Sequence, residues 1–135
     1  MYRYQLIRLG ALVGHRALQI TGVVCKRTVL PGKVVIYGIQ PNGLDKAGRP
    51  LDQIQAMAVS LDWKKEDEEE TFFPADFLDK PVQDKITGFL GVGVYFLDEY
   101  DGRRVLAIKP VGLSEVDGKI QGVREFPLDN CQPPA

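Results

Sequence analysis

The sequence predicts an all-β, mainly antiparallel fold, formed as a single barrel or sandwich of about seven to nine strands. Three observations lead to this prediction: runs of alternating apolar and polar residues, short turns rich in Gly and Pro, and no long amphipathic helical pattern. Two Asp-Gly pairs, Asp101-Gly102 and Asp117-Gly118, lie between apolar runs, where they signal hairpins. At most one or two short helical turns are expected.

The length and composition are those of one globular domain. The chain has 135 residues, of which 44% are hydrophobic and 26% charged. We expect a single β-rich domain over residues 1–130 and a short C-terminal tail over residues 131–135. The start of the chain has no secretory signal features, and the longest low-charge run, residues 9–24, is too interrupted to span a membrane. A cytoplasmic protein is therefore predicted.

The N-terminal strands are predicted from two runs around a turn. Residues 17–24 alternate between apolar and polar side chains with the period of a half-buried strand. Pro31 and Gly32 occupy positions that suit a type II turn. Residues 33–40 follow as a nearly all-apolar run, typical of a central strand.

The middle of the chain combines a loop, a strand and a charged run. Residues 41–50 contain two Pro and three more Gly or Asn residues, so a mobile surface loop is expected. In residues 53–63 apolar and polar side chains alternate again, which predicts one antiparallel strand with one face less exposed to solvent. That face would carry Met57, Val59, Leu61 and Trp63. The run 64–70 is interpreted as a solvated loop, and residues 74–78 suit a single helical turn.

The C-terminal third carries the strongest strand signals. Its predicted strands lie within residues 85–97, 103–109, 111–116 and 119–128. The two Asp-Gly turns separate four of these runs into hairpins. Pro110 cannot donate a ladder hydrogen bond, so it is expected to mark a bend or a sheet edge.

A strip of glycines in one predicted strand is the first candidate site. Strict alternation places Phe89, Gly91, Gly93 and Tyr95 on one face of that strand. Two glycines in register leave backbone uncovered between two aromatic rings. Glycine within a strand marks a bend or a close approach of another group. The functional alternative is a groove in which Phe89 and Tyr95 hold a ligand or a partner.

A basic N-terminal region is the second candidate site. Residues 1–50 contain eight Lys or Arg and a single acid, Asp45, within a chain whose net charge is −1. Six of the basic residues form a candidate anion or nucleic-acid patch: Arg3, Arg8, Arg16, Lys26, Arg27 and Lys33. Such residues gain affinity for phosphates by releasing counterions. Compensation by the acidic remainder, or association between unlike-charged surfaces of identical subunits, would account for the same asymmetry.

No residue set in the sequence predicts catalysis or metal binding. The single histidine, His15, and the two cysteines, Cys25 and Cys131, are too few for a zinc site from one chain. Cys131 is expected to be exposed in the tail. The acids around residues 98–101 do not follow a calcium-loop pattern. No catalytic residue, metal site or cofactor is therefore predicted.

The leading functional hypothesis is a non-enzymatic β-rich binding or assembly module. Its partner would be another protein or a second copy of the chain, and the module could be part of a larger particle. No membrane partner is expected. The first alternative is an oligonucleotide-binding β-barrel that uses the basic N-terminal third. The second is a small-molecule enzyme of unknown class, for which His15 and acids brought near it by folding are the best candidates.

Overall fold

The computed structural model describes residues 2–110 and 122–134. This part of the chain is all-β, with antiparallel strands and short 3-10 turns, and its sheets do not close into a barrel. The all-β prediction is confirmed, whereas closure into a barrel is wrong. The second predicted hairpin turn, at Asp117-Gly118, and the predicted strand at 111–116 lie outside the described residues.

The described residues form twelve strands and five 3-10 turns, more than expected because several strands are only two to four residues long. The strands in the first half of the chain are β1 (Tyr2–Ile7), β2 (Leu12–His15), β3 (Ile20–Leu30), β4 (Val34–Pro41), β5 (Ile54–Ala56) and β6 (Leu61–Asp62). The later strands are β7 (Glu68–Phe73), β8 (Pro81–Asp84), β9 (Leu90–Glu99), β10 (Arg104–Pro110), β11 (Arg124–Pro127) and β12 (Cys131–Gln132). The turns are η1 (Pro31–Lys33), η2 (Ala58–Ser60), η3 (Lys65–Asp67), η4 (Ala75–Phe77) and η5 (Leu128–Asn130).

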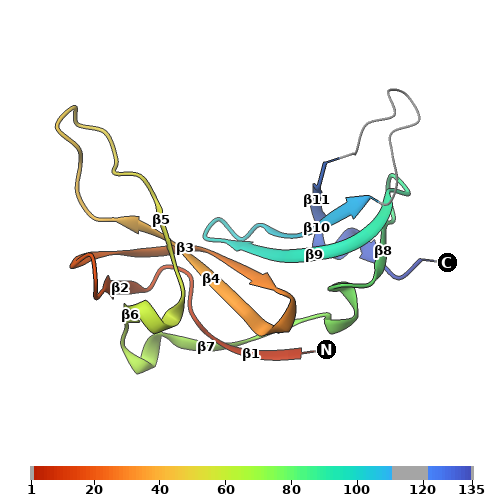
Figure 1. Cartoon of the computed structure of the whole chain (residues 1–135), viewed down its shortest axis with the longest axis horizontal. Coiled ribbons are helices and arrows are strands. Elements are labelled where there is room, and N and C mark those ends of the chain that lie inside the picture. The colour runs from red at the N-terminus through yellow and green to blue at the C-terminus, as the bar shows by residue number, and fades with distance from the viewer. Residues whose placement is uncertain (1, 111–121, 135) are drawn as a thin grey trace.

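The strands β3, β4 and β9 form the centre of the larger sheet. Its main path runs β11-β10-β9-β3-β2-β6, while β4 pairs with β3 and β5, and β8 with β9 and β12. The strands β1 and β7 form a separate two-stranded sheet. Figure 1 shows β2 and β6 toward one end of the elongated molecule and β8, β10 and β11 toward the other.

Two clusters of buried side chains hold these sheets together. The first contains Phe73, Phe96 and Leu106, and the second contains Tyr37, Ile39 and Leu61. The strand β1 contributes to both clusters, because it has Tyr4 and Leu6 in the first and Ile7 in the second. This short N-terminal strand, which the sequence did not lead us to predict, is thus fastened along most of its length.

The segment 53–63 is not one continuous strand. The turn η2 separates β5 from β6, and it reverses the side-chain alternation at this point. As a result Leu61 is buried, but Met57 is 48% and Val59 74% exposed. The predicted dry face is therefore wrong for Met57 and Val59, which project from the surface.

Three further segments differ from expectation or refine it. Residues 68–70 belong to β7 and pair with β1, although the charged run was expected to be a loop. The predicted helical turn near residues 74–78 is present as η4. Cys131 is buried in β12, which pairs with β8, so its predicted exposure is wrong.

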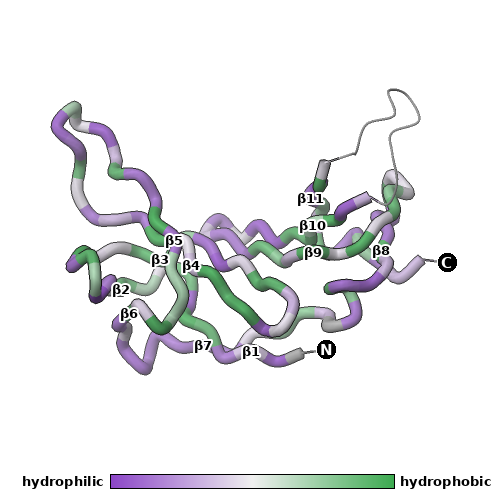
Figure 2. Tube along the Cα trace, viewed as in Figure 1, coloured by the Kyte–Doolittle hydropathy of each residue, from purple (hydrophilic) through white to green (hydrophobic). Residues whose placement is uncertain are grey.

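Residues 41–53 form an arm that extends from the rest of the molecule (Figure 1). Its tip is ordered by Asp45, whose Oδ1 accepts hydrogen bonds from the backbone N–H groups of Ala47 and Arg49. A bridge between Leu44 and Pro50 joins its two sides. Figure 2 shows mostly hydrophilic residues along the arm and hydrophobic ones along the centre of β4.

None of the described residues forms a helix that is long and apolar enough to cross a membrane.

Candidate functional site

The glycine strip of β9 does not form the groove expected from strict alternation. The register between β9 and β10 shifts at a bulge, where Gly93 pairs with Ile108 but Tyr95 pairs with Ala107. A bulge inserts one extra residue and so reverses which residues share a face. Tyr95 therefore lies on the opposite face from Gly91 and Gly93, and donates its hydroxyl to Glu125 on β11 at 2.8 Å.

The chain itself covers the two glycines. A Cβ atom on Gly93 would collide with the backbone carbonyl of Phe77 in η4, and one on Gly91 with the carbonyl of Lys109. Phe89 packs against Phe126, with ring centroids 5.1 Å apart. The glycines thus allow close approach of other parts of the chain, as expected if they have a structural role rather than forming a groove.

The six predicted patch residues are spread over the surface and most have acidic neighbours. Three form exposed ion pairs: Arg3 with Glu70 at 3.2 Å, Arg8 with Asp67 at 2.8 Å and Arg16 with Asp62 at 2.8 Å. Arg27 is buried, Lys26 lays its methylene groups over Gly38, and Lys33 ends the β3–β4 turn. The acids of residues 62–70 therefore offset much of the basic N-terminal charge.

Arg27 is the centre of a buried charge network. Its Nη2 binds Asp98 at 2.8 Å, and both side chains are only 3% exposed. Its Nη1 binds Glu69 at 2.6 Å and the carbonyl of Ile7 at 3.2 Å. Arg104 completes the network by binding the other oxygen of Asp98 at 2.7 Å. These contacts join β3, β9 and β10 to the two-stranded sheet.

A groove between β1 and β4 is the strongest candidate for a functional site. It has a volume of about 450 Å³ and is lined by residues 3–6, 33–35, 37 and 57–59. We call it the edge groove. Its apolar lining includes exposed side chains of Val34, Met57 and Val59. Its only charged lining residues among those described are Arg3 and Lys33, and both are basic.

The strand β1 presents to this groove an edge that, within residues 2–110 and 122–134, is unpaired at Arg3 and Gln5. The N–H of Ile7 donates to the Tyr37 hydroxyl at 3.1 Å, on the side away from β7, whereas the N–H of Arg8 bonds to Asp67 on the β7 side. Backbone groups alternate along a paired strand. Arg3 and Gln5 therefore face the same way as Ile7, and no described residue bonds to their N–H and C=O groups there.

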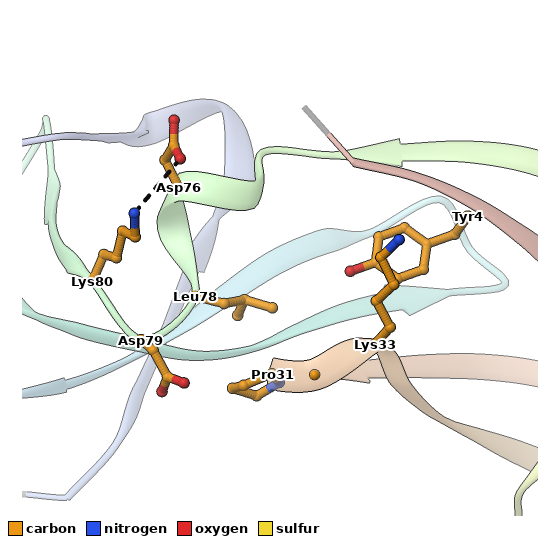
Figure 3. Close-up of a pocket in the computed structure, with 8 residues that line it drawn as sticks. Tyr4, Pro31, Lys33, Asp76, Leu78, Asp79 and Lys80 are labelled. Carbon is orange, nitrogen blue, oxygen red and sulfur yellow. Dashed lines mark ion pairs between the residues drawn. The ribbon is translucent and has the colours of Figure 1, made fainter.

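A second pocket adjoins the edge groove, because Tyr4 and Lys33 line both. It has a volume of about 530 Å³ and lies between the β3–β4 turn and residues 76–80. Figure 3 shows Tyr4 and Lys33 at one end of this pocket and the Asp76–Lys80 ion pair at the other. Two of its lining residues, Lys33 and Asp79, have left-handed backbone conformations, with φ of 61° and 59°.

The titratable side chains of the described residues do not assemble a catalytic or metal centre. No cluster of three His, Cys, Asp or Glu suited to a metal ion is present among them. The Nδ1 atom of His15 accepts the N–H of Leu18 within a turn. Burial raises the pKa of the Cys25 thiol and raises the pKa of Cys131 to about 11, so neither favours the reactive thiolate.

The edge groove was not predicted from the sequence. The alternation in residues 3–6 was a signal that could have revealed the strand β1, but not which of its edges would stay unpaired. No family model, curated protein or solved structure matches this chain. The geometry of the groove is therefore the basis for its interpretation.

Proposed function

We propose that this chain is a non-enzymatic binding or assembly module that receives part of another polypeptide in the edge groove. The observation that carries the proposal is the exposure of Val34, Met57 and Val59 around a groove with a strand edge that no described residue pairs at Arg3 and Gln5. Apolar side chains gathered in this way are typical of interaction surfaces. A second copy of the chain is included among the partners that this proposal covers.

The structure favours a protein partner over an oligonucleotide. Phosphate binding requires cationic groups that can approach the nucleic acid together. Here Arg3, Arg8 and Arg16 each have a carboxylate within 3.2 Å, and Arg27 is buried against Asp98. The apolar lining of the edge groove suits polypeptide side chains better than a phosphate backbone.

A peptide-display selection tests the proposal. The full chain serves as bait, and the double variant Met57→Asp, Val59→Asp serves as the matched control, because both side chains are exposed and their replacement leaves the core intact. We expect selected peptides to bind the variant at least about tenfold more weakly, equal to about 1.4 kcal/mol. Peptides that bind both proteins equally, or no enrichment at all, would contradict it.

Self-association is measured separately. Sedimentation velocity of the wild-type chain over a range of concentrations reports whether a second copy is the partner. If oligomers form through the groove, the same double variant is expected to be monomeric. Oligomers that persist in the variant would place the contact elsewhere and would count against the groove as the assembly surface.

A further inference from the structure

We propose that the edge groove binds one extended segment of a partner protein, rich in apolar and acidic residues, which adds as a strand to the free edge of β1. This inference rests on the proposed function and names the class of partner and how it is held. Strand addition uses backbone hydrogen bonds for affinity and pockets for alternate side chains for selectivity. Residues of β1 and of the groove lining meet both requirements.

The backbone of β1 supplies the hydrogen bonds. The N–H and C=O groups of Arg3 and Gln5 point away from β7 and into the groove, as the contacts of Ile7 with Tyr37 and Arg27 establish for this side of the strand. Unpaired strand edges are templates for another strand. At the Ile7 end the edge is closed by side chains, so an added strand would extend toward Arg3.

The opposite wall is also a strand with an open edge. The strand β5 pairs only with residues 37–39 of β4, which leaves residues 34–36 without a partner on that side among the described residues. Because backbone groups alternate, at least one of these three residues directs its N–H and C=O outward. An extended segment in the groove would lie between two strand edges.

The charge of the groove selects an acidic segment. Its charged lining residues are Arg3 and Lys33, and no described acid lines it. The ion pair of Arg3 with Glu70 is exposed, with side-chain exposures of 68% and 43%, so it holds Arg3 only weakly. The apolar lining, which includes Leu6, Val35 and Val59, accommodates the alternate apolar side chains of the same segment.

The other edge of β1 already binds a strand of this kind. The strand β7, with the sequence Glu-Glu-Glu-Thr-Phe-Phe, pairs with β1 in antiparallel register and places Glu70 opposite Gln5. Since β7 of the same chain is already engaged on the other side of β1, it does not supply the occupant of the free edge. The pairing also supplies a probe of the right chemistry.

The probe is a fluorescein-labelled peptide that copies residues 66–75, Glu-Asp-Glu-Glu-Glu-Thr-Phe-Phe-Pro-Ala. We expect it to bind the full chain in fluorescence anisotropy, with an affinity that decreases as salt increases. The control peptide has Lys in place of each acid and is expected to bind at least about tenfold more weakly. No binding of the acidic peptide, or equal binding of both, overturns the proposal.

A proline at Gln5 tests the backbone contact. Gln5→Pro removes an N–H that faces the groove while it leaves the β1–β7 ladder intact, and proline is tolerated on a strand edge. Gln5→Ala is the matched control, because it shortens the side chain and keeps the N–H. We expect peptide affinity to decrease at least about tenfold in Gln5→Pro and to change little in Gln5→Ala.

Hydrogen exchange of the wild-type complex keeps the test decisive if Gln5→Pro does not fold. Strand addition protects the amides of Arg3 and Gln5. Changes confined to Tyr4 and Leu6, whose amides face β7, would show that the peptide replaces β7 and would overturn the proposal. If display-selected peptides require Met57 and Val59 but leave Arg3 and Gln5 unprotected, strand addition fails while the proposed function stands.

Discussion

Arg27 carries a positive charge into the interior because three strands, β1, β7 and β9, supply oxygen atoms around it. Its partners are Asp98, Glu69 and the carbonyl of Ile7, and Arg104 shares Asp98. Desolvating these charges is costly, and their mutual attraction only offsets that cost when the geometry is complete. The network therefore adds a polar connection between the two sheets to the packing of the two buried clusters.

Loss of this side chain is expected to be severe. Arg27→Met leaves Asp98 buried with one partner fewer, so we expect the free energy of unfolding to decrease by about 3–5 kcal/mol in urea denaturation. Arg16→Met removes the exposed pair with Asp62 and should cost less than about 1 kcal/mol. Equal effects of the two substitutions would contradict the role assigned to burial.

Asp84 makes the stability of the protein depend on pH. Its Oδ2 accepts hydrogen bonds from the hydroxyl of Thr87 at 2.6 Å and from its backbone N–H at 2.8 Å, and these bonds hold the pKa of Asp84 below its ordinary 3.8. A group whose pKa is lowered by folding stabilises the protein above its unfolded pKa. That contribution disappears as the pH decreases through the folded pKa.

The variant Thr87→Val removes the hydroxyl that donates to Asp84 and so tests its contribution to stability. We expect it to be less stable than wild type at neutral pH, and the difference to shrink as the pH decreases below 3.8 and through the lowered pKa of Asp84, until the carboxyl is protonated in both proteins. Thr87→Ser keeps the hydroxyl and is expected to follow the wild type. Urea denaturation at neutral and acidic pH measures both. A difference that does not change with pH would assign the effect to packing.

At the scale of elements, close contact between segments decides where glycine is needed. Gly93 lets the backbone of η4 approach β9, since any side chain would meet the carbonyl of Phe77. The backbone there also bonds directly, because the N–H of Asp79 donates to the carbonyl of Gly93 at 2.9 Å. The turn η4 in turn brings Asp76 and Leu78 to the pocket beside the edge groove.

A methyl group at Gly93 should disturb this contact. We expect Gly93→Ala to lower the free energy of unfolding by about 1–3 kcal/mol, the usual cost of overpacking. Gly14→Ala is the matched control, because a Cβ there lies 4.0 Å from the nearest atom, the carbonyl oxygen of Ile20. Thermal unfolding followed by circular dichroism compares the two. A stable Gly93→Ala that loses partner binding would instead support the predicted glycine groove.

Across the whole molecule, basic residues of the N-terminal region form ion pairs with acidic residues from later in the chain. The basic residues of β1 and of the region around β2 meet acids from residues 62–70, across separations of 46 to 67 positions in sequence. Such exposed pairs contribute little stability individually. Their consequence is that the N-terminal half does not present its full positive charge to solvent.

Nucleic-acid affinity is therefore expected to be low. A fluorescein-labelled single strand of about 15 nucleotides should show no saturable anisotropy change at physiological salt, where non-specific binders have Kd values of about 10⁻⁴–10⁻⁶ M. The triple variant Glu70→Gln, Asp67→Asn, Asp62→Asn frees Arg3, Arg8 and Arg16 and is expected to bind more tightly at low salt. Salt-sensitive binding by the wild type would favour the oligonucleotide-binding alternative.

Local patterns were sufficient for much of the fold. The alternation in residues 17–24 agrees with β3 from residue 20 onward, although residues 17–19 form a turn. The nearly all-apolar run 33–40, the first Asp-Gly turn and the Pro at residue 74 correspond to β4, the β9–β10 hairpin and η4. The short strands were not predicted, because two to four residues carry too little periodicity to separate them from loops. The bulge in β9 was missed for a related reason, since it depends on the partner strand rather than on local residues.

The amino-acid sequence was enough to predict that this protein is all-β and that its charges are unequally distributed along the chain. These properties follow from side-chain period and composition, which are local. The position of Tyr95 away from the glycine face, the acids beside the basic residues and the edge of β1 at Arg3 and Gln5, which no described residue pairs, follow from the three-dimensional arrangement. Each of these depends on which segments meet in space, and pairing between distant strands is not encoded in any single stretch of residues.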